Sequence, residues 1–429
     1  MRVLITTDAF PPVCGGSGWS TYELAKGLRS RSHHVEIIRP LVDHSEEVTE
    51  SFDDFTPTMF RHWSPSVPYV RNYFKNELLY KRLTKYLSRV IRENKIDIVH
   101  AQHRLTGPPS IAAANLEGIP SVCTVRDYWP VCYWSDLIVT PESDALCPSC
   151  TVSTMTHCVR PRAGTLWPLT VPMIPYMRSN LARKRVALSC ATAVTAVSSV
   201  IARDLRARAP ELTGVTVQAI PNPVDVEGLR HTAASLPSPS IGKYGLFVGK
   251  LEINKGVLKL VEALERAQFD LPFVVVGDGS ERERLEQTAK ATGLDIRFTG
   301  WLPRDEVLAW MCHAMLLAFP SHGPESLSRV LLESCVLGVP VAAMDTGGTG
   351  DIIRHDETGL LSTTVDQLGA DIGRLRDDSH LRHRLGRAAQ KHVDTTFSTS
   401  VVIRQIESLY ERLCEACLLY TSPSPRDRG

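Results

Sequence analysis

Short apolar runs that alternate with helical patterns constrain the fold of this 429-residue chain more than any other feature. In the first half, apolar runs predict strands at 1–7, 35–38, 96–100, 121–125, 193–197 and 217–220. Helical patterns lie between most of these runs, at 76–93, 109–117 and 200–209, and another helix begins at Trp19. Such alternation predicts a doubly wound α/β domain on a parallel sheet.

The same alternation restarts after a stretch rich in Ser and Pro at 235–240. The second half predicts strands at 244–248, 273–276, 296–299, 315–319, 339–344 and 359–361. Helices are predicted at 257–267, 281–292, 305–312, 326–337 and 365–376. Because the chain is too long for one core, we predict two domains. Their boundaries are an N-terminal domain at 1–234 with an insertion at 128–160, a linker at 235–242, a C-terminal domain at 243–397 and a last helix at 398–416.

Charge is nearly balanced over the whole chain, with a net charge of +1, but not between its halves. Residues 1–240 hold 26 Lys and Arg against 21 Asp and Glu, and residues 241–429 hold 22 against 26. The basic first half fits an anionic acceptor or a membrane surface, with an ordinary solvated surface as the alternative. A nucleic-acid partner is not expected.

The termini and the cysteines bear on the compartment. Only three consecutive apolar residues follow Arg2, so no signal peptide is predicted, and we expect a cytoplasmic protein that acts in solution or at the inner face of the membrane. The apolar region at 166–196 is interrupted by three prolines and four basic residues, which argues against a membrane span. Eleven cysteines in a reducing compartment argue against a disulfide framework.

Residues 319–335 read F-P-S-H-G-P-E-S-L-S-R-V-L-L-E-S-C and carry the pattern of a ligand-binding turn. An apolar strand ends at Pro320, and a helix is predicted to begin near Ser326, so its free N–H groups point beyond the strand. Glu325 and Glu333 would lie at most ~12 Å apart along that helix. Two carboxylates so placed can bind two hydroxyl-bearing parts of one ligand. Ordinary solvated glutamates are the alternative.

With Gly-Val-Pro-Val at 338–341, this stretch resembles the P-S-x-x-E-G-F-G-x-x-x-x-E-A-x-A-x-G-x-P-V signature of retaining glycosyltransferases of family 4. The chain departs from the signature at Ser326, Leu327 and Ser328, where the family usually has Gly-Phe-Gly. The resemblance implies the GT-B fold, in which two Rossmann-like domains face each other across a cleft and the last helix crosses back to the first domain. It also implies a nucleoside-diphosphate sugar as donor and a sugar or lipid-linked acceptor.

Other segments resemble the donor site of that family. The run F-V-G-K-L-E-I-N-K-G at 247–256 resembles V-G-R-L-x-x-x-K-G, which implies that Lys250 and Lys255 contact the diphosphate. Lys250 replaces an arginine and lacks its bidentate fork. Gly15 and Gly16 stand where a glycine turn of the first domain approaches the diphosphate, although a simple turn is the alternative.

Three further positions complete the donor site that the resemblance implies. Gly277, in V-G-D-G-S, lets the chain turn out of a strand, and the backbone at Trp301 and Leu302 meets the base. Glu333 would bind the ribose hydroxyls. Glu325, followed by Ser326 and Leu327, would bind the donor sugar.

No Asp-x-Asp motif occurs in the chain. Enzymes of the other common sugar-transferase fold use that motif to hold a metal ion on the diphosphate. A metal-independent reaction without a required cofactor is therefore implied, with the two lysines supplying the positive charge.

Two segments resemble the acceptor side of the family, D-I-V-H-A-Q-H at 97–103 and S-V-C-T-V-R-D at 121–127. In relatives a histidine of the second segment faces the donor sugar, and Arg126 stands there in this chain. Arginine cannot act as a base, but it can hydrogen-bond a sugar or a leaving phosphate. His100 and His103 remain candidates, and a structural role is the alternative for each.

Four cysteines follow in the predicted insertion, and Cys147-Pro-Ser-Cys150 has the spacing of a zinc knuckle. Cys132 and Cys158 would complete a structural zinc site. Unpaired loop cysteines are the alternative. At the other end of the chain, residues 417–429 resemble the translation of a transposon sequencing adapter and are set aside from the interpretation.

These patterns predict a retaining glycosyltransferase, with Glu325, Lys255, Lys250, Arg126 and His100 as the catalytic candidates. A nucleotide-sugar epimerase of the same fold is one alternative. A nucleotide-sugar-binding protein without catalysis is the other, because Arg126 replaces the expected histidine.

Overall fold

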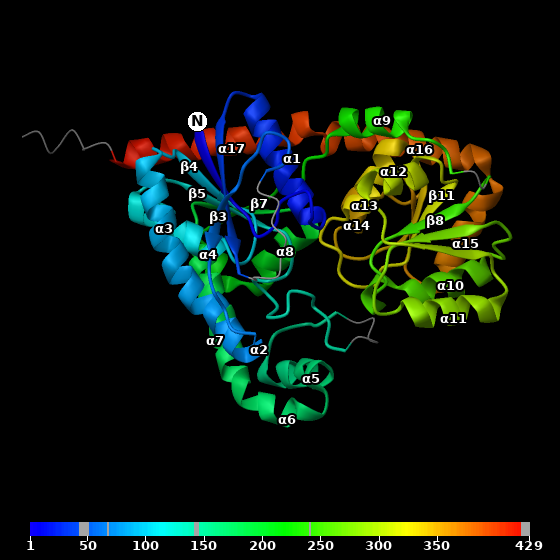
Figure 1. Cartoon of the computed structure of the whole chain (residues 1–429), viewed down its shortest axis with the longest axis horizontal. Coiled ribbons are helices and arrows are strands. Elements are labelled where there is room, and N and C mark those ends of the chain that lie inside the picture. Colours follow the sequence, from blue (N-terminus) through cyan, green and yellow to red (C-terminus); the bar gives the residue numbers. More distant parts are fainter. Residues whose placement is uncertain (43–50, 67, 141–145, 240–241, 422–429) are drawn as a thin grey trace, which may run out of the picture. The chain divides into compact units, whose positions relative to one another are not determined.

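The chain forms two compact α/β units in a computed structural model that describes residues 1–42, 51–66, 68–140, 146–239 and 242–421 (Figure 1). The first unit comprises residues 1–135, 169–223 and 399–429, and the second comprises 136–168 and 224–398. Residues 240–241 of the predicted linker and 422–429 of the predicted tail lie outside the described ranges. Two doubly wound, Rossmann-like domains were predicted from the alternation of strands and helices, and this fold class is confirmed.

In the described residues, the first unit is built on a seven-stranded parallel sheet with the order β3-β2-β1-β4-β5-β6-β7. The strands contain mostly buried β-branched and small residues, as strands covered on both faces require. Their bounds are β1 Arg2–Thr6, β2 His34–Leu41, β3 Thr58–Arg61, β4 Ile98–Ala101, β5 Ser121–Val125, β6 Ala193–Ala196 and β7 Thr216–Ala219.

Helices cover both faces of this sheet. On one face α1 (Gly16–Ser30) and α17 (Thr399–Thr421) pack together in a core with β1, and Gly27 gives Ile403 of α17 room to approach α1. On the other face α3 (Leu79–Glu93) and α4 (Gly107–Glu117) pack side by side. The last helix thus returns to the first domain as predicted, and it runs to Thr421 rather than 416. The unit also contains α2 (Pro68–Tyr73), α7 (Ile174–Ser189) and α8 (Ser199–Arg208).

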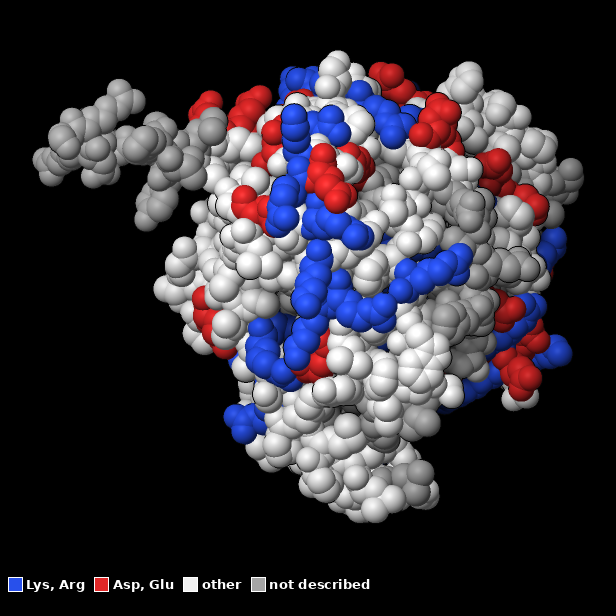
Figure 2. Space-filling model, turned by 60° about the vertical axis from the view of Figure 1, so that its left-hand side comes forward, with Lys and Arg blue, Asp and Glu red and all other residues white. Residues whose placement is uncertain are grey.

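The outer surface of α3 is strongly basic. Leu79, Leu83, Leu87 and Ile91 are buried at helical spacing, and the opposite face is turned to solvent. Five basic side chains are exposed along it, at Lys81, Arg82, Lys85, Arg89 and Arg92. Figure 2, in which the α3 side of Figure 1 comes forward, shows Lys and Arg side chains in a nearly continuous band.

In the described residues, the second unit is built on a six-stranded parallel sheet with the order β10-β9-β8-β11-β12-β13. Its strands are β8 Gly245–Val248, β9 Phe273–Val276, β10 Ile296–Gly300, β11 Leu316–Phe319, β12 Val341–Met344 and β13 Leu360–Ser362. The main core lies beneath α10 (Val257–Arg266) and α15 (Val365–Asp377), which pack against each other. The remaining helices are α5 Val152–Ala163, α9 Val226–Ser235, α11 Arg282–Thr292, α12 Arg304–Cys312, α13 Arg329–Leu337, α14 Thr349–Ile352 and α16 Ser379–Thr396, and α6 Trp167–Thr170 lies at the boundary between the units.

The boundary between the units differs from the predicted linker at 235–242. It falls at Pro223, because α9 packs on α12 and α13 of the second unit. The backbone N–H of Val224 also donates to the Phe397 carbonyl over 2.9 Å, which fixes the start of this segment. Residues 136–168, which hold most of the predicted insertion, also belong to the second unit. Within the described residues, no helix has the length and apolar character needed to cross a membrane.

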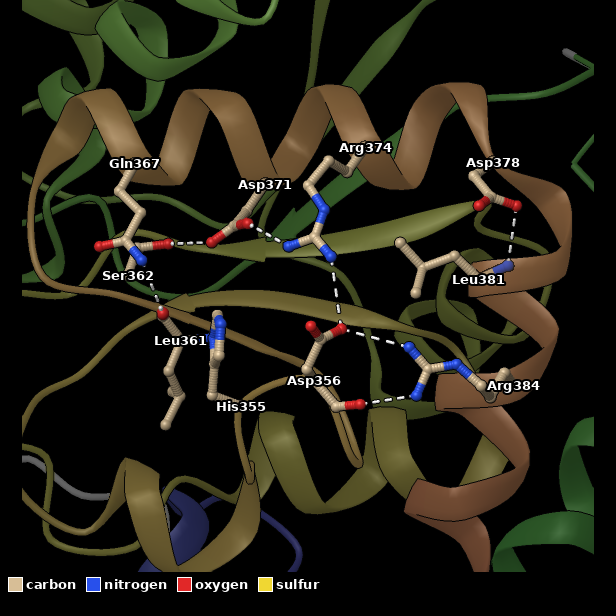
Figure 3. Close-up of polar contacts among 10 residues, drawn as sticks. All are labelled: His355, Asp356, Leu361, Ser362, Gln367, Asp371, Arg374, Asp378, Leu381 and Arg384. Carbon is tan, nitrogen blue, oxygen red and sulfur yellow. Dashed lines mark hydrogen bonds and ion pairs between the residues drawn. The ribbon is translucent and has the colours of Figure 1, made fainter.

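A buried carboxylate joins α15 to the sheet of the second unit (Figure 3). Asp371 is 3% exposed, and it accepts hydrogen bonds from Ser362 Oγ at 2.9 Å and from Arg374 at 3.0 Å. Arg374 also reaches Asp356, which pairs with Arg384 of α16 at 3.2 Å. The network connects β13 with α15 and α16 through groups that satisfy one another, as burial of a charge requires.

Asp371→Ala should lower the stability of the second unit by about 1–3 kcal/mol, because the Ser362 hydroxyl loses its buried acceptor. The urea midpoint, followed by circular dichroism, measures the loss. Asp366→Ala on the same helix is the control, since the Asp366 side chain is 77% exposed. Equal midpoints for the two variants would show that the buried network contributes nothing.

Candidate active site

The sheet of the second unit reverses its chain order between β8 and β11, which are neighbours although β9 and β10 separate them in sequence. In doubly wound sheets, ligands bind outside the carboxyl ends of the strands at such a reversal. The segments that leave β8 and β11 hold Lys255 and Glu325. This edge of the sheet is therefore the candidate active site.

Glycines allow the backbone segments at this edge to cross in close contact. The N–H of Gly249 donates to the Val276 carbonyl at 3.0 Å, and the N–H of Gly277 donates to the Gly300 carbonyl at 2.9 Å. Gly277 has a φ of 137°, and a Cβ there would overlap the carbonyl oxygen of Gly249. The predicted turn at Gly277 is thus a steric requirement for bringing three strand ends together.

Glu325 is held by two side chains in the loop after β11. Its Oε1 accepts hydrogen bonds from Lys255 Nζ and from Ser321 Oγ, each at 2.6 Å. The side chains of Glu325 and Lys255 are 12% and 28% exposed, so the ion pair is largely shielded from water. The structure therefore brings together the two residues that were predicted to contact the donor sugar and its diphosphate.

The backbone around Glu325 is fixed from both sides. The N–H of Gly323 donates to the Asn254 carbonyl at 2.9 Å, which joins this loop to the one that carries Lys255. The N–H of Gly348 donates to the Glu325 carbonyl at 2.7 Å, from the loop after β12. Neighbouring Gly347 has a φ of 53°, and a Cβ there would overlap the Glu325 main chain. Three loops thus position one carboxylate.

Glu333 lies on α13 and is only 8% exposed. Its Oε1 accepts hydrogen bonds from Arg329 Nε at 3.0 Å and from Arg304 at 2.9 Å. Two guanidinium groups that donate to one oxygen hold this carboxylate in a fixed orientation. The alternative of an ordinary solvated glutamate is therefore excluded for Glu333.

The helix after Glu325 begins later than predicted. It starts at Arg329 and not near Ser326, because Ser328 is extended, with φ −71° and ψ 120°, and serves as the N-cap. Residues Ser326 and Leu327 therefore belong to the loop, and the Leu327 side chain is buried. Leu327 occupies a position where the family signature has phenylalanine.

Other predicted donor residues differ in exposure. Lys250 is 77% exposed and lies 3.9 Å from Glu252, so its ammonium is held only loosely. Trp301 follows β10 and is 76% exposed, whereas Leu302 is half-buried. An indole that is so exposed next to a strand end is available for stacking on a ligand.

In the first unit, Gly15 and Gly16 begin α1 directly after the β1 loop. Gly15 is the N-cap and has no side chain to cap the helix, and its carbonyl accepts the N–H of Gly18 at 3.0 Å. The N–H groups of Gly16 and Ser17, which precede that bond, are left for other acceptors. A Cβ at Gly15 would meet no atom within 4 Å inside the chain, so packing does not explain this glycine.

Arg126 and His100 are both buried, in different settings. Arg126 donates to Asn222 and to Gln102 at the carboxyl ends of the strands. His100 lies in the core between Tyr410, whose hydroxyl is 2.5 Å from Nδ1, and Thr124, whose hydroxyl is 2.6 Å from Nε2. Burial, with Arg126 nearby, lowers the pKa of His100 to about 3. Both ring nitrogens are engaged, so the structure favours the structural role for His100 over the catalytic one.

The four cysteines of the predicted zinc site give that prediction no geometric support. Cys147 donates to the Ser149 carbonyl at 3.4 Å, and Cys158 donates to the Met155 carbonyl at 3.3 Å. Over the parts of the chain that the structure describes, which include Cys132 and Cys150, no group of three or more His, Cys, Asp or Glu side chains is placed to hold a metal ion. Structural zinc thus stays a prediction from spacing alone.

Several residues of the site were not predicted. Ser321 lies inside the signature stretch, and its spacing of four from Glu325 gave no hint of a hydrogen bond in a loop. Arg329 and Glu333 have the i,i+4 spacing of a helical ion pair, which the sequence does show. Arg304 lies 29 residues from Glu333, and only the fold brings the two together.

Gly347→Ala should destabilise the second unit by about 1–3 kcal/mol, because the new methyl group overlaps the Glu325 main chain. Gly350→Ala is the matched control, since the nearest atom to a Cβ there is 3.7 Å away. Thermal unfolding of both variants compares them. If Gly347→Ala and Gly350→Ala have the same melting temperature, the loop after β12 does not fix Glu325.

Comparisons with known proteins agree with this geometry. Residues 14–227 match the family model described as Glycosyltransferase Family 4, and residues 232–392 match the model described as Glycosyl transferases group 1. The 2-deoxystreptamine N-acetyl-D-glucosaminyltransferase of Niallia circulans is 35% identical over 159 residues, which cover 34% of this chain and 41% of that relative. The glycogen synthase of Mycobacterium tuberculosis is 24% identical over an alignment covering 96% of this chain and 94% of that relative.

The structure of Anabaena HepE in complex with UDP-glucose aligns with a TM-score of 0.63 and 18% identity, over 96% of this chain and 100% of that one. This likeness concerns the fold. Together, the matched models cover both units, and both describe glycosyltransferases. The chain belongs to the family 4 glycosyltransferases of the GT-B fold.

Proposed function

We propose that the enzyme transfers a sugar from a nucleoside-diphosphate donor to a sugar or lipid-linked acceptor, with retention of the anomeric configuration and without a metal ion. The observation that carries the proposal is the Glu325 carboxylate, held by Lys255 and Ser321 at the carboxyl edge of the second sheet. The fold neighbour HepE, which binds UDP-glucose, supports the donor class. The resemblance to family 4 supports retention.

The diphosphate would be neutralised by lysines. Lys255 is anchored by Glu325, whereas Lys250 is exposed and would contact a ligand from the surface. Since Glu325 and Lys255 share one short contact, the carboxylate that binds the sugar also orients the cation that stabilises the leaving phosphate. Glu333, oriented by Arg304 and Arg329, would bind the ribose hydroxyls.

Arg126 would act by charge and not by proton transfer. Its guanidinium is anchored by Asn222 and Gln102, and an arginine stays protonated in proteins. In a retaining reaction on one face of the sugar, the leaving phosphate can take the proton of the attacking hydroxyl. A base at position 126 is then unnecessary.

Two other functions remain alternatives: a nucleotide-sugar epimerase and a donor-binding protein without turnover. Incubation with UDP-, GDP- and ADP-sugars separates them. Slow hydrolysis, and transfer once an acceptor is supplied, supports the transferase. An isomerised sugar supports the epimerase, whereas tight binding with no turnover for any acceptor supports the binding protein. Transfer that persists in EDTA would support a metal-independent reaction.

Glu333→Ala should weaken binding of the cognate nucleoside diphosphate at least about tenfold, because a charged acceptor for the ribose hydroxyls is lost. Glu325→Ala should leave that affinity nearly unchanged, because the Lys255 ammonium remains to bind phosphate, but it should lower turnover. Isothermal titration with UDP, GDP and ADP, together with a transfer assay, measures both.

Glu283→Ala is the control for these variants, because Glu283 is exposed on α11. It should behave as the wild type in both assays. Unchanged affinity in Glu333→Ala would refute the ribose assignment. An equal loss of affinity in Glu325→Ala and Glu333→Ala would refute the division of roles.

We also propose that the first unit meets an anionic membrane, which would bring a lipid-linked acceptor to the site. One observation behind this is the basic band of α3 (Figure 2). The other is a group of aromatic side chains at the end of α2 and just before it. Trp63 and Tyr73 are 57% and 50% exposed, and both pack against Phe74, with centroid distances of 5.4 and 6.3 Å. Exposed aromatics next to basic residues suit a membrane interface.

The segment at 160–185 was the predicted membrane contact, and its prolines do break it into short helices. Leu169 is 75% exposed there, but Trp167 is stacked beneath Arg160 at 4.4 Å. The α2–α3 surface therefore offers the better match of exposed aromatic and basic side chains.

The enzyme should co-sediment with phosphatidylglycerol vesicles at low salt and detach as salt rises, since the attraction is screened. Trp63→Ala should bind the vesicles less than the wild type. Leu116→Ala removes an apolar side chain of α4 that is 70% exposed, against 57% for Trp63, and should not change binding. A wild-type protein that stays in the supernatant at low salt would point to a soluble acceptor.

A further inference from the structure

Four charged side chains converge at the carboxyl edge of the sheet in the first unit. Asp8 follows β1, Arg104 follows β4, Asp127 follows β5, and Lys184 projects from α7. Asp8 accepts the N–H of Leu105, the residue next to Arg104, and the charge of Arg104 contributes to the pKa shifts of Asp8, Asp127 and Lys184. The strands β1 and β4 are the pair at which this sheet reverses its chain order, the place where ligands bind in such sheets.

The two cations of this cluster lack hydrogen-bond acceptors inside the chain. Lys184 is only 4% exposed, and its ammonium lies 5.7 Å from the centre of the Tyr133 ring. Among the described residues, none accepts a hydrogen bond from the Lys184 ammonium or from the half-buried Arg104 guanidinium. Burial lowers the pKa of Lys184 to about 7, and the positive charge of Arg104 contributes. A buried ammonium without an acceptor is costly.

Nearby carboxylates do not compensate these cations through hydrogen bonds. Asp8 Oδ2 accepts the N–H of Leu105 at 3.1 Å, and Asp127 Oδ1 accepts the N–H of Trp129 at 2.8 Å. Glu77, which also acts on Lys184, is paired with Arg183 at 2.7 Å. The donors of Arg104 and Lys184 are thus not used by these carboxylates, and oxygen atoms of a ligand would be suitable acceptors for them.

We propose that Arg104 and Lys184 bind an anionic group of the acceptor, a phosphate or a carboxylate, at the β1–β4 edge of the first sheet. This inference rests on the proposed glycosyl transfer, because it assigns the anion to the acceptor. An anion satisfies two cations at once, which a neutral hydroxyl does not. A purely structural ion cluster is the alternative, and it makes the opposite prediction for stability.

The test uses the full chain saturated with UDP, so that added anions do not compete for the donor site. Thermal shift is measured with inorganic phosphate and with D-glucose 6-phosphate at constant ionic strength, with D-glucose as the neutral control. The variants are Lys184→Met and Arg104→Gln, and Arg178→Gln on the exposed side of α7 is the matched control. UDP affinity is measured for each variant by titration.

We expect glucose 6-phosphate, but not glucose, to raise the melting temperature of the wild type and of Arg178→Gln. The apparent affinity for glucose 6-phosphate should fall at least about tenfold in Lys184→Met and in Arg104→Gln, because each variant loses one charge-assisted hydrogen bond. Without ligand, Lys184→Met should melt no lower than the wild type, because an apolar side chain replaces a buried ammonium that donates no hydrogen bond. A structural cluster predicts that this variant melts lower.

Each other outcome has a distinct meaning. Equal shifts in the wild type and in both site variants would overturn the proposal. Inorganic phosphate that binds as tightly as glucose 6-phosphate would show a free-phosphate site and overturn the assignment to the acceptor. A wild type that binds no UDP, GDP or ADP would instead contradict the proposed donor. In that case the anion site is still tested without nucleotide, and a melting-temperature shift that the wild type shows and Lys184→Met lacks would support it.

Discussion

Reversal of chain order in a parallel sheet is the constraint on which both candidate sites depend. In each unit the strand that starts the sheet becomes a central strand, and the later strands add on its other side. The loops that leave the two central strands therefore diverge, and the carboxyl edge between them is where polar side chains gather. Glu325 with Lys255 in the second unit and Asp8 with Arg104 in the first occupy equivalent edges.

The two edges differ in how their charges are satisfied. In the second unit the carboxylates are fixed by cations, since Lys255 bonds Glu325 and two arginines bond Glu333. In the first unit, Asp8 and Asp127 are held by backbone N–H groups, so the N–H donors of Arg104 and Lys184 are not used by these carboxylates. A site that orients carboxylates suits the hydroxyl groups of a nucleotide sugar. A site with spare cationic donors suits an anionic partner.

A structural feature can be predicted from the sequence when the residues that determine it are close together in the chain. Strand 273–276 was predicted with the observed bounds, because four buried apolar residues in a row form a central parallel strand. The helix after Glu325 was placed three residues too early, since apolar spacing alone does not show that Ser328 is extended. The boundary at Pro223 has no local signal, because α9 resembles any amphipathic helix until its packing partners are known. The burial of His100 against Tyr410 joins residues 310 apart and has no local signal.

The contacts of Arg126 lead to a different interpretation than its place in the motif does. By motif, an arginine in place of a histidine indicates lost catalysis, which favours a binding protein. In the structure, the guanidinium is buried and anchored by Gln102 after β4 and by Asn222 after β7, so the strand ends hold a fixed positive charge at this edge. A buried charge needs hydrogen-bond partners, and the two amide oxygens supply them. A fixed cation can stabilise a leaving phosphate through every stage of the reaction, whereas a histidine does so only when it is protonated. In the proposed reaction, the substitution would change how charge is supplied at this position and would leave transfer possible.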